Sequence, residues 1–227
     1  MIVSLHMPKT GGMSFGELLG RSFGDRLLRD YADDAGYRTP ELVERARRNA
    51  VAVRAGRAEL AARYDAIHGH FVADKYAGVF ADGRFVAFFR DPVQQAISHY
   101  RFLQRNPQLH HPVVRVFHDT RPTLAEFVRW PATGNPQTMF LGSLAVEDLA
   151  FVGLREEFAR SLALFARTMG RDLGSEVHAN LDPESRGTTH RLDPATRRAV
   201  EAAYAADVEL YRRARAEFAR RCARHGV

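Results

Sequence analysis

The sequence predicts a single-domain α/β protein with a mostly parallel central sheet flanked by helices. Apolar runs of strand length occur at residues 2–6, 84–89 and 151–154, and each precedes a segment with helical periodicity. Strands that alternate with helices favour parallel pairing, because each helix carries the chain back to the start of the next strand. The 227 residues fit one domain, and neither a linker nor an internal repeat divides residues 1–227.

The elements of the first half follow from apolar runs and helix start signals. Thr39 and Pro40 are typical of a helix start, because a threonine side chain can cap the first turn and proline fits inside it. Asp91 and Pro92 repeat this pattern after the second buried run. The predicted elements are strands at 2–6, 66–68 and 84–89 and helices at 14–22, 40–63 and 91–104.

The second half begins with residues 106–122, whose prolines and histidines predict a surface excursion. Thr123 and Glu126 have the spacing of a capping box, in which each side chain bonds the backbone of the other residue. Asp193 and Pro194 begin a long final helix. The predicted elements are a helix from 123, a strand at 151–154, a helix at 156–169, a polar loop at 171–192 and a helix at 193–224.

Composition narrows the class of protein. The formal net charge of +6 favours anionic ligands, although the arginines could equally form solvated helix faces. Cys222 is the only cysteine, which excludes a disulfide within the chain and a multi-cysteine zinc site. We find no signal peptide, and no apolar run approaches the roughly 18 residues that a membrane span needs. We therefore expect a cytoplasmic protein without stable membrane insertion.

The most informative segment is residues 6–15, where a strand leads into a turn with two glycines and then into a helix. A helix N-terminus presents free N–H groups and the positive end of the helix dipole, so it binds phosphate well. Only two of the 33 basic residues are lysines, which distinguishes Lys9 from a generic surface cation. The lysine precedes both glycines, unlike in a Walker A loop. The simpler alternative is an ordinary strand-to-helix turn.

A second segment of the same design follows the strand at 84–89. Arg90 lies at the carboxyl end of that strand, where ligands bind in open α/β sheets. Ser98 follows after roughly two helical turns, so both side chains can face one phosphate. The alternative is an arginine paired with Asp91. Together the two segments predict two anion sites, as a nucleotide with phosphates at both ends of its ribose requires.

The chain resembles the PAPS-dependent sulfotransferases in three places. These are residues 8–12, residues 90–92 and the pair Ser98 and Tyr100. The nearer likeness is to carbohydrate sulfotransferases of the heparan sulfate 2-O-sulfotransferase type and their bacterial relatives, and it spans residues 2–170. The resemblance implies a P-loop-NTPase-like sulfotransferase fold. It also implies 3′-phosphoadenosine 5′-phosphosulfate (PAPS) as the sulfate donor, 3′-phosphoadenosine 5′-phosphate (PAP) as the product, and no metal.

The resemblance gives each segment a role. The first loop holds the 5′-phosphosulfate, with Lys9 at the leaving oxygen, and the second segment holds the 3′-phosphate. The run from Ile67 to Phe71 resembles a His-Gly-His segment whose second histidine is the catalytic base, which assigns that role to His70. The donor-binding residues that the resemblance implies are Lys9, Thr10, Gly11, Gly12, Met13, Ser14, Arg90, Ser98 and Arg186.

Other positions match less well. His68, Asn135 and Gln137 are weaker candidates for contact with the acceptor, and an exposed loop arginine is an alternative interpretation of Arg186. Two positions depart from the family pattern. Met13 stands where threonine or serine is usual. In the second segment, glutamine 95 stands where a second arginine is common.

The sequence therefore predicts an enzyme that transfers a sulfuryl group to an acceptor hydroxyl by in-line displacement. Histidine is suited to remove the acceptor proton, because its ordinary pKa is about 6.5. The alternatives are another nucleotide-binding phosphotransferase, such as a small kinase, and a basic polyanion-binding module. No recognised nucleic-acid motif is present, so we expect no nucleic-acid partner. We expect a bacterial-type enzyme whose acceptor is a sugar, a glycolipid or a small natural product.

Overall fold

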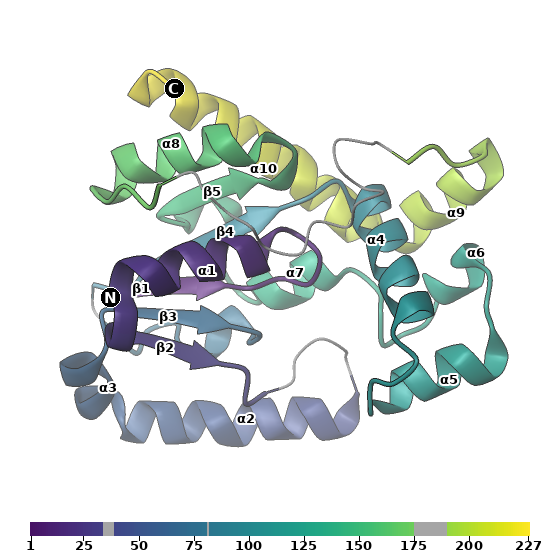
Figure 1. The fold of residues 1–227 in the computed structure, drawn as a ribbon, viewed down its shortest axis with the longest axis horizontal. Helices are drawn as coiled ribbons and strands as arrows, with labels where there is room; N and C mark the ends of the chain where they lie inside the picture. The colour runs from purple at the N-terminus through teal and green to yellow at the C-terminus, as the bar shows by residue number, and fades with distance from the viewer. Residues whose placement is uncertain (34–38, 81, 175–189) are drawn as a thin grey trace.

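The computed structural model describes residues 1–33, 39–80, 82–174 and 190–227. Its centre is a five-stranded sheet with the strand order β2-β3-β1-β4-β5, and every pairing is parallel. The strands are β1 (Ile2–Leu5), β2 (Leu27–Asp30), β3 (Ala66–Gly69), β4 (Arg84–Phe89) and β5 (Phe151–Leu154). The predicted α/β class with a parallel sheet and flanking helices is confirmed (Figure 1).

Helices surround this sheet, and several lie on the side toward which the strands point. In Figure 1, α4, α5, α6 and α9 lie on that side, and α2 lies beside β2 at the sheet margin. The helices are α1 (Gly12–Phe23), α2 (Pro40–Ala55), α3 (Arg57–Arg63), α4 (Pro92–Arg105), α5 (Pro112–Thr120), α6 (Leu124–Phe127), α7 (Pro136–Leu141), α8 (Phe158–Met169), α9 (Pro194–Ala203) and α10 (Ala205–His225). None of those in the described ranges is long and apolar enough to cross a bilayer.

The structure confirms the predicted helix start signals. The side chains of Thr39 and Asp91 accept backbone N–H groups three residues on, at 3.4 and 3.0 Å. Thr123 and Glu126 form the full capping box at the start of α6. Asp193 caps α9 in the same way as Asp91 caps α4. These local signals are accurate because a cap needs only neighbouring residues.

Two predicted helices are each divided in two. The helix predicted at 40–63 is α2 and α3, with a break at Gly56, whose residue type disfavours helix interiors. The helix predicted at 193–224 is α9 and α10, with a break at Tyr204, where φ is −108° and ψ is 31°. The Tyr204 ring is fully buried in an apolar cluster, so tertiary packing accompanies the change of direction.

Three further elements were not predicted. The surface excursion at 106–122 contains α5, which begins at Pro112. The strand β2 is only four residues long and includes charged residues, so it has no continuous apolar run. Helix α7 is a short segment of six residues. Such short elements are stabilised mainly by their neighbours, which the local sequence pattern does not show.

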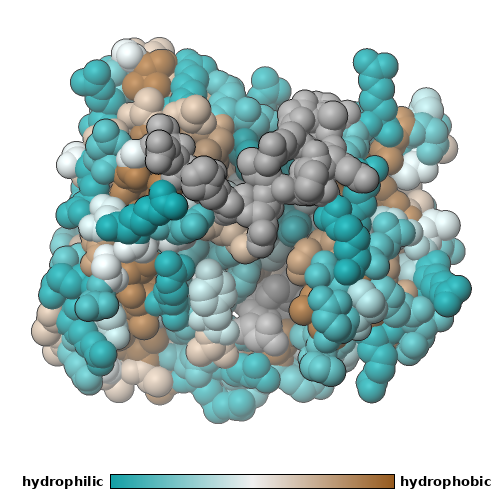
Figure 2. Space-filling view, viewed as in Figure 1, coloured by the Kyte–Doolittle hydropathy of each residue, from teal (hydrophilic) through white to brown (hydrophobic). Residues whose placement is uncertain are grey.

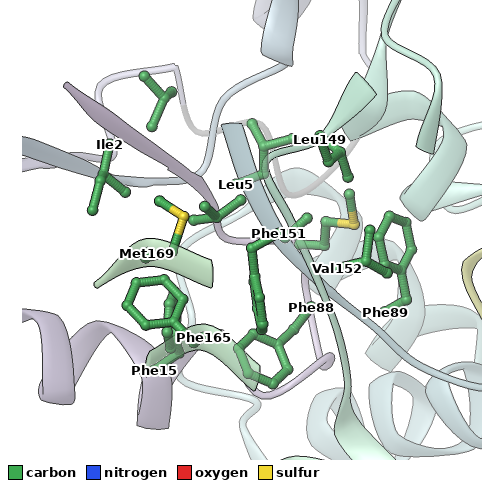
Figure 3. Close-up of a cluster of buried hydrophobic side chains, with 14 of the residues drawn as sticks. Ile2, Leu5, Phe15, Phe88, Phe89, Leu149, Phe151, Val152, Phe165 and Met169 are labelled. Atoms are coloured by element: carbon green, nitrogen blue, oxygen red, sulfur yellow. The ribbon is translucent and has the colours of Figure 1, made fainter. Parts of the chain in front are cut away.

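The main core packs α1 and α8 against the sheet through a group of aromatic rings, shown in Figure 3. Phe15 of α1 lies 4.9 Å from Phe88 of β4, between ring centres, and 5.3 Å from Phe165 of α8. Phe151 of β5 lies 5.2 Å from Phe165 in an edge-to-face arrangement. Such aromatic pairs contribute roughly 0.5–1.5 kcal/mol beyond the burial of their area. The core therefore fixes the start of α1 relative to β4 and β5.

A second apolar cluster joins the helices beyond the carboxyl edge of the sheet. It draws on α4, α5, α6 and α9, with Phe117 and Phe127 among its fully or nearly fully buried rings. The ring of Trp130 packs edge-to-face on that of Phe127, with centres 5.4 Å apart. This cluster holds one side of α4 in place, while other residues of α4 contact the loop after β1.

Two of the three glycines of α1 face buried histidine rings at close range. A Cβ atom at Gly12 would lie 1.9 Å from the Cδ2 atom of His6, and one at Gly16 would lie 2.4 Å from the Nε2 atom of His68. Real side chains do not tolerate such distances, and both imidazoles are buried. The glycines thus make room for two histidine rings beneath α1.

We therefore predict that Gly16→Ala destabilises the protein by about 1–3 kcal/mol, because the added methyl group must displace α1 or the His68 ring. Denaturant unfolding measures this change. Gly56→Ala is the matched control, since its Cβ would meet only the Ala52 carbonyl oxygen at an ordinary 3.5 Å. Equal free energies of unfolding for the two variants would contradict this account of α1 packing.

Candidate functional site

The carboxyl ends of the five strands bring a set of polar and aromatic side chains to one edge of the sheet. His6, Tyr31, His70, Arg90 and Arg155 each directly follow a strand, in the order β1, β2, β3, β4 and β5. The chain continues from β1 toward β2 on one side and from β4 toward β5 on the other. Ligands of open parallel sheets bind at such a switch point, which here lies between β1 and β4.

The loop between β1 and α1 has the features of an anion site. Gly11 precedes the helix with φ at 99°, and no side chain caps the first turn. That turn contains no acidic residue, so the positive end of the helix dipole is not offset there. The N–H groups of the first turn have no carbonyl partner within the helix. The Thr10 hydroxyl donates to the Met7 carbonyl at 3.0 Å and so closes the loop from within.

Lys9 has a strained backbone. Hydrogen bonds from side chains at the end of β4 and on α4 hold the backbone of residues 8 and 9. Its φ is 63°, a left-handed conformation that costs a residue with a side chain roughly 1–2 kcal/mol. The Arg90 guanidinium donates to the Lys9 carbonyl at 2.9 Å, and the Gln95 amide donates to the Pro8 carbonyl at 2.7 Å. The two segments that the sequence singled out therefore lie against each other.

Gln137 completes this connection from α7. Its side-chain amide accepts from the Arg90 N–H at 3.0 Å and donates to the Arg90 carbonyl at 2.8 Å. It also donates to the Gln95 side-chain oxygen at 3.0 Å. Gln95 and Gln137 are both buried, so this chain of amides is shielded from water. Gln95, which stands where the sulfotransferase pattern has a second arginine, thus supports the loop after β1.

Asn135 and Gln137, weaker candidates for acceptor contact, have protein partners in this structure. The Asn135 side chain accepts from the Asp207 N–H at 3.0 Å and donates to the Ala203 carbonyl at 3.3 Å. It thereby ties the start of α7 to the junction of α9 and α10. Gln137 has no exposed surface. Both side chains occupy supporting positions behind the edge of the sheet.

The Lys9 side chain extends over α4. Its ammonium nitrogen lies 4.4 Å from the centre of the Phe102 ring, a cation–π contact. His99, on the same helix, is buried and packs edge-to-face on Phe127 at 5.3 Å. Burial and the nearby Lys9 charge lower the pKa of His99 to about 3, so this ring is uncharged at neutral pH.

Ser98 is half-buried on α4, between Gln94 and Arg101, which both bond His190. The Gln94 amide exchanges two hydrogen bonds of 2.9 Å with the backbone of His190. The Arg101 guanidinium bonds the His190 ring at 3.1 Å. The helix is thus tied to His190 on both sides of Ser98. Arg186, implied by the resemblance, lies outside the described residues.

Three histidine rings form a stack at the ends of β1 and β3. The His6 ring lies between the other two, 4.1 Å from His70 and 5.0 Å from His68 between ring centres, with interplanar angles of 22° and 20°. The Ser4 hydroxyl and His68 Nδ1 are 2.9 Å apart, and so are the Tyr31 hydroxyl and His6 Nδ1. His70 is the outermost and the most exposed of the three.

The inner two rings are uncharged at neutral pH. Burial lowers the pKa of His68 to about 3, with further lowering by the charges of His70 and Arg29. Burial also places the pKa of His6 well below its ordinary value, and the charges of His70, His68 and Lys9 lower it further. The stack therefore presents two neutral imidazoles behind His70.

Lys75, the second lysine of the chain, lies in a buried ion cluster with two aspartates. Its ammonium group is 2.6 Å from an Asp30 oxygen and 2.8 Å from an Asp33 oxygen. The Tyr76 hydroxyl donates to Asp30 at 2.7 Å, and the Asn49 amide donates to Asp33 at 2.6 Å. The two aspartates stand on either side of Tyr31 in the chain, so the cluster fixes the position of that tyrosine.

The sequence did not assign roles to His6, Tyr31 and Lys75. His6 belongs to the opening motif and is the last residue of the strand predicted at 2–6, which was a usable signal. Tyr31 follows β2, which was not predicted, so the sequence could not place it at the same edge. The rarity of lysine, which distinguished Lys9 in the sequence, applies equally to Lys75, and the structure gives both lysines specific partners.

Comparison with known proteins adds no assignment: no protein-family model matches the chain, and no curated protein is found to be similar. Within the described ranges, no group of three or more histidine, cysteine or acidic residues could hold a metal ion. The groups available for chemistry are an uncapped helix start without acidic residues, an arginine and a lysine in the adjoining loops, and a partly exposed imidazole at the same sheet edge.

We predict that Lys75→Met destabilises the protein by about 3–5 kcal/mol, because two buried carboxylates lose their counter-charge. Denaturant unfolding at neutral pH measures the change. Arg26→Met is the control, since Arg26 forms a similarly short ion pair of 2.6 Å with Asp65 that is exposed to solvent. The control should change stability little. A Lys75→Met protein as stable as this control would contradict the proposed bracing of Tyr31.

A second prediction concerns acid stability. The folded protein keeps His68 and His99 neutral down to a pKa of about 3, whereas the unfolded chain protonates them near pH 6.5. The unfolded state then binds more protons between these values, so stability falls as the pH drops below about 6.5. Each such histidine lowers the free energy of unfolding by up to about 1.4 kcal/mol for each pH unit below 6.5.

The variant His99→Gln should therefore show a shallower loss of stability between pH 6.5 and pH 4 than the wild-type protein. Unfolding titrations at a series of pH values measure the slopes. His110→Gln, at an exposed position, should keep the wild-type slope. Parallel curves for wild type and His99→Gln would show that His99 does not titrate as its burial requires.

Proposed function

We propose that the protein is a PAPS-dependent sulfotransferase with a P-loop-NTPase-like sulfotransferase fold. The observation that carries this proposal is the direct bond between the two anion segments, from the Arg90 guanidinium to the strained Lys9 backbone, beside His70 at the same sheet edge. A donor with a phosphosulfate at one end and a 3′-phosphate at the other needs two neighbouring anion sites. The uncapped start of α1 suits the phosphosulfate.

In the proposed reaction, the acceptor oxygen attacks the sulfur atom of PAPS while the bond from sulfur to the bridging phosphate oxygen breaks. His70 takes the acceptor proton, and PAP leaves with the electron pair of the broken bond. Lys9 donates to the bridging oxygen as its charge grows. The backbone N–H groups of residues 11–14 hold the non-bridging oxygens. The enzyme's main contribution is thus alignment and charge stabilisation.

Met13 is compatible with this role although it lacks a hydroxyl. Its side chain is 60% exposed in the first turn of α1, while its backbone remains part of the helix start. A phosphate oxygen can accept from that backbone N–H without any contribution from the side chain. The usual hydroxyl contact would be missing, and the remaining donors of the loop would carry the binding.

The basic charge offers less support for a polyanion-binding module. Several exposed arginines pair with a glutamate one helical turn away, as Arg197 does with Glu201 and Arg212 with Glu209. Figure 2 shows hydrophilic residues spread over both sides of this face among apolar patches. These ion pairs favour solvated helix faces for the arginines that form them. No observation favours a kinase, and ATP with magnesium serves as a comparison ligand.

The experiment is calorimetric titration of PAP, followed by sulfate transfer from labelled PAPS to a panel of sugars, glycolipids and small hydroxylated compounds. Lys9→Ala and His70→Ala should abolish or greatly reduce transfer, since removal of a general base typically costs about 10²–10⁴-fold in rate. Transfer should not require added metal. Turnover of ATP with magnesium, without PAP binding, would replace the proposal with a phosphotransferase.

We further predict that Ser98→Ala weakens PAP binding by about tenfold or more, because a hydrogen bond to a charged group contributes roughly 1.5–3 kcal/mol. The dissociation constant from calorimetry measures the effect. Ser22→Ala, at the far end of α1 where Ser22 contacts Arg171, is the matched control and should bind PAP as wild type does. Unchanged affinity in Ser98→Ala would remove Ser98 from the 3′-phosphate site.

A further inference from the structure

His70 is enclosed by aromatic rings from three other parts of the chain. One face stacks on His6 with ring centres 4.1 Å apart. The Tyr31 ring meets it nearly at right angles at 5.1 Å, and the Phe140 ring does so at 5.9 Å. These contacts limit the orientations that the imidazole can adopt. A base that must meet one oxygen atom benefits from such a limit, because misplacement by about 1 Å can cost roughly 100-fold in rate.

His6 links His70 to the loop that precedes α1. On one side it stacks on His70, and on another it packs against Gly12, where a Cβ would lie 1.9 Å from its ring. Its Nδ1 atom lies 2.9 Å from the Tyr31 hydroxyl, which fixes the rotation of the ring. His6 is also buried and uncharged at neutral pH, so it does not add a positive charge beside a protonated His70.

Tyr31 is in turn held by the ion cluster around Lys75. Asp30 precedes it and Asp33 follows it by two residues, and Lys75 bonds both carboxylates. The Ala32 N–H also donates to the Asp30 side chain at 3.2 Å. The backbone on both sides of Tyr31 is thus tied to one buried ammonium group. The hydroxyl is therefore presented to His6 from a fixed support.

We propose that His6 and Tyr31 are positioning residues for His70, and that they hold the base in one orientation beside the Lys9 loop. The inference rests on the proposed function, in which His70 removes the acceptor proton. Tyr31 acts on His70 both directly, through its ring, and through the hydroxyl that orients His6. The two residues directly follow β1 and β2, so the geometry of the base depends on neighbouring strands as well as on β3.

Two variants separate the contributions of the hydroxyl and the stacked ring. Tyr31→Phe keeps the ring beside His70 and removes only the hydroxyl, and we expect it to lower kcat by about tenfold. His6→Asn keeps a polar partner for the hydroxyl and removes the stacked ring, and we expect a loss of about 100-fold. In both, the KM for PAPS and the affinity for PAP should stay near wild type, because the donor contacts are intact.

Tyr64→Phe is the matched control, since Tyr64 is half-buried at the end of α3 and is not part of the site. It should keep the wild-type kcat. Denaturant unfolding shows whether His6→Asn remains folded. If His6→Asn does not fold, the kcat of Tyr31→Phe decides the inference. A wild-type kcat in Tyr31→Phe, with transfer measurable, overturns the inference and leaves the proposed function intact.

Failure of the proposed function is recognised separately, as an absence of PAP binding by the wild-type protein. In that case, or where no acceptor gives measurable transfer, the ring resonances of His70 decide the inference. They are assigned by comparison with His70→Gln. We expect a single set of signals in the wild type and in Tyr64→Phe, and broadened or doubled signals in Tyr31→Phe. Identical His70 signals in Tyr31→Phe and wild type would overturn the positioning role.

Discussion

The site depends on the hydrogen bond from the Arg90 guanidinium to the Lys9 carbonyl. It joins the loops after β1 and β4, which diverge from each other at the centre of the sheet. Lys9 occupies a left-handed conformation that an isolated chain disfavours, and it persists because the neighbouring structure determines it. The amides of Gln95 and Gln137 bond the same two segments from behind. Strain in the loop is therefore balanced by buried polar bonds.

The edge of the sheet combines charged and uncharged groups in separate places. Cations lie beside the start of α1, whereas burial keeps His6 and His68 neutral under the same helix. The charge of Lys75 is paired with those of Asp30 and Asp33 in a buried cluster. The partly exposed His70 imidazole thus packs against a neutral, closely packed support.

The sequence predicted the parallel α/β class, the main strands and the helix caps, because these follow from local periodicity and neighbouring residues. It also singled out Lys9, Arg90, Ser98 and His70, and the structure brings Lys9 to Arg90 across 81 residues of chain. It did not reveal that Gln137 is buried among backbone groups or that Tyr31 supports His6. Both facts depend on elements, α7 and β2, that are too short to have a periodicity of their own.

The central claim is that the two anion segments bind the two ends of one nucleotide. The most direct measurement compares the calorimetric affinity of the wild-type protein for PAP and for 5′-AMP, which lacks the 3′-phosphate, in buffer containing a metal chelator. The account predicts PAP binding at one site, at least about tenfold tighter than 5′-AMP, because one charge-assisted phosphate contact is worth roughly 1.5–3 kcal/mol. Equal affinity for the two nucleotides, or no binding of PAP, would contradict it.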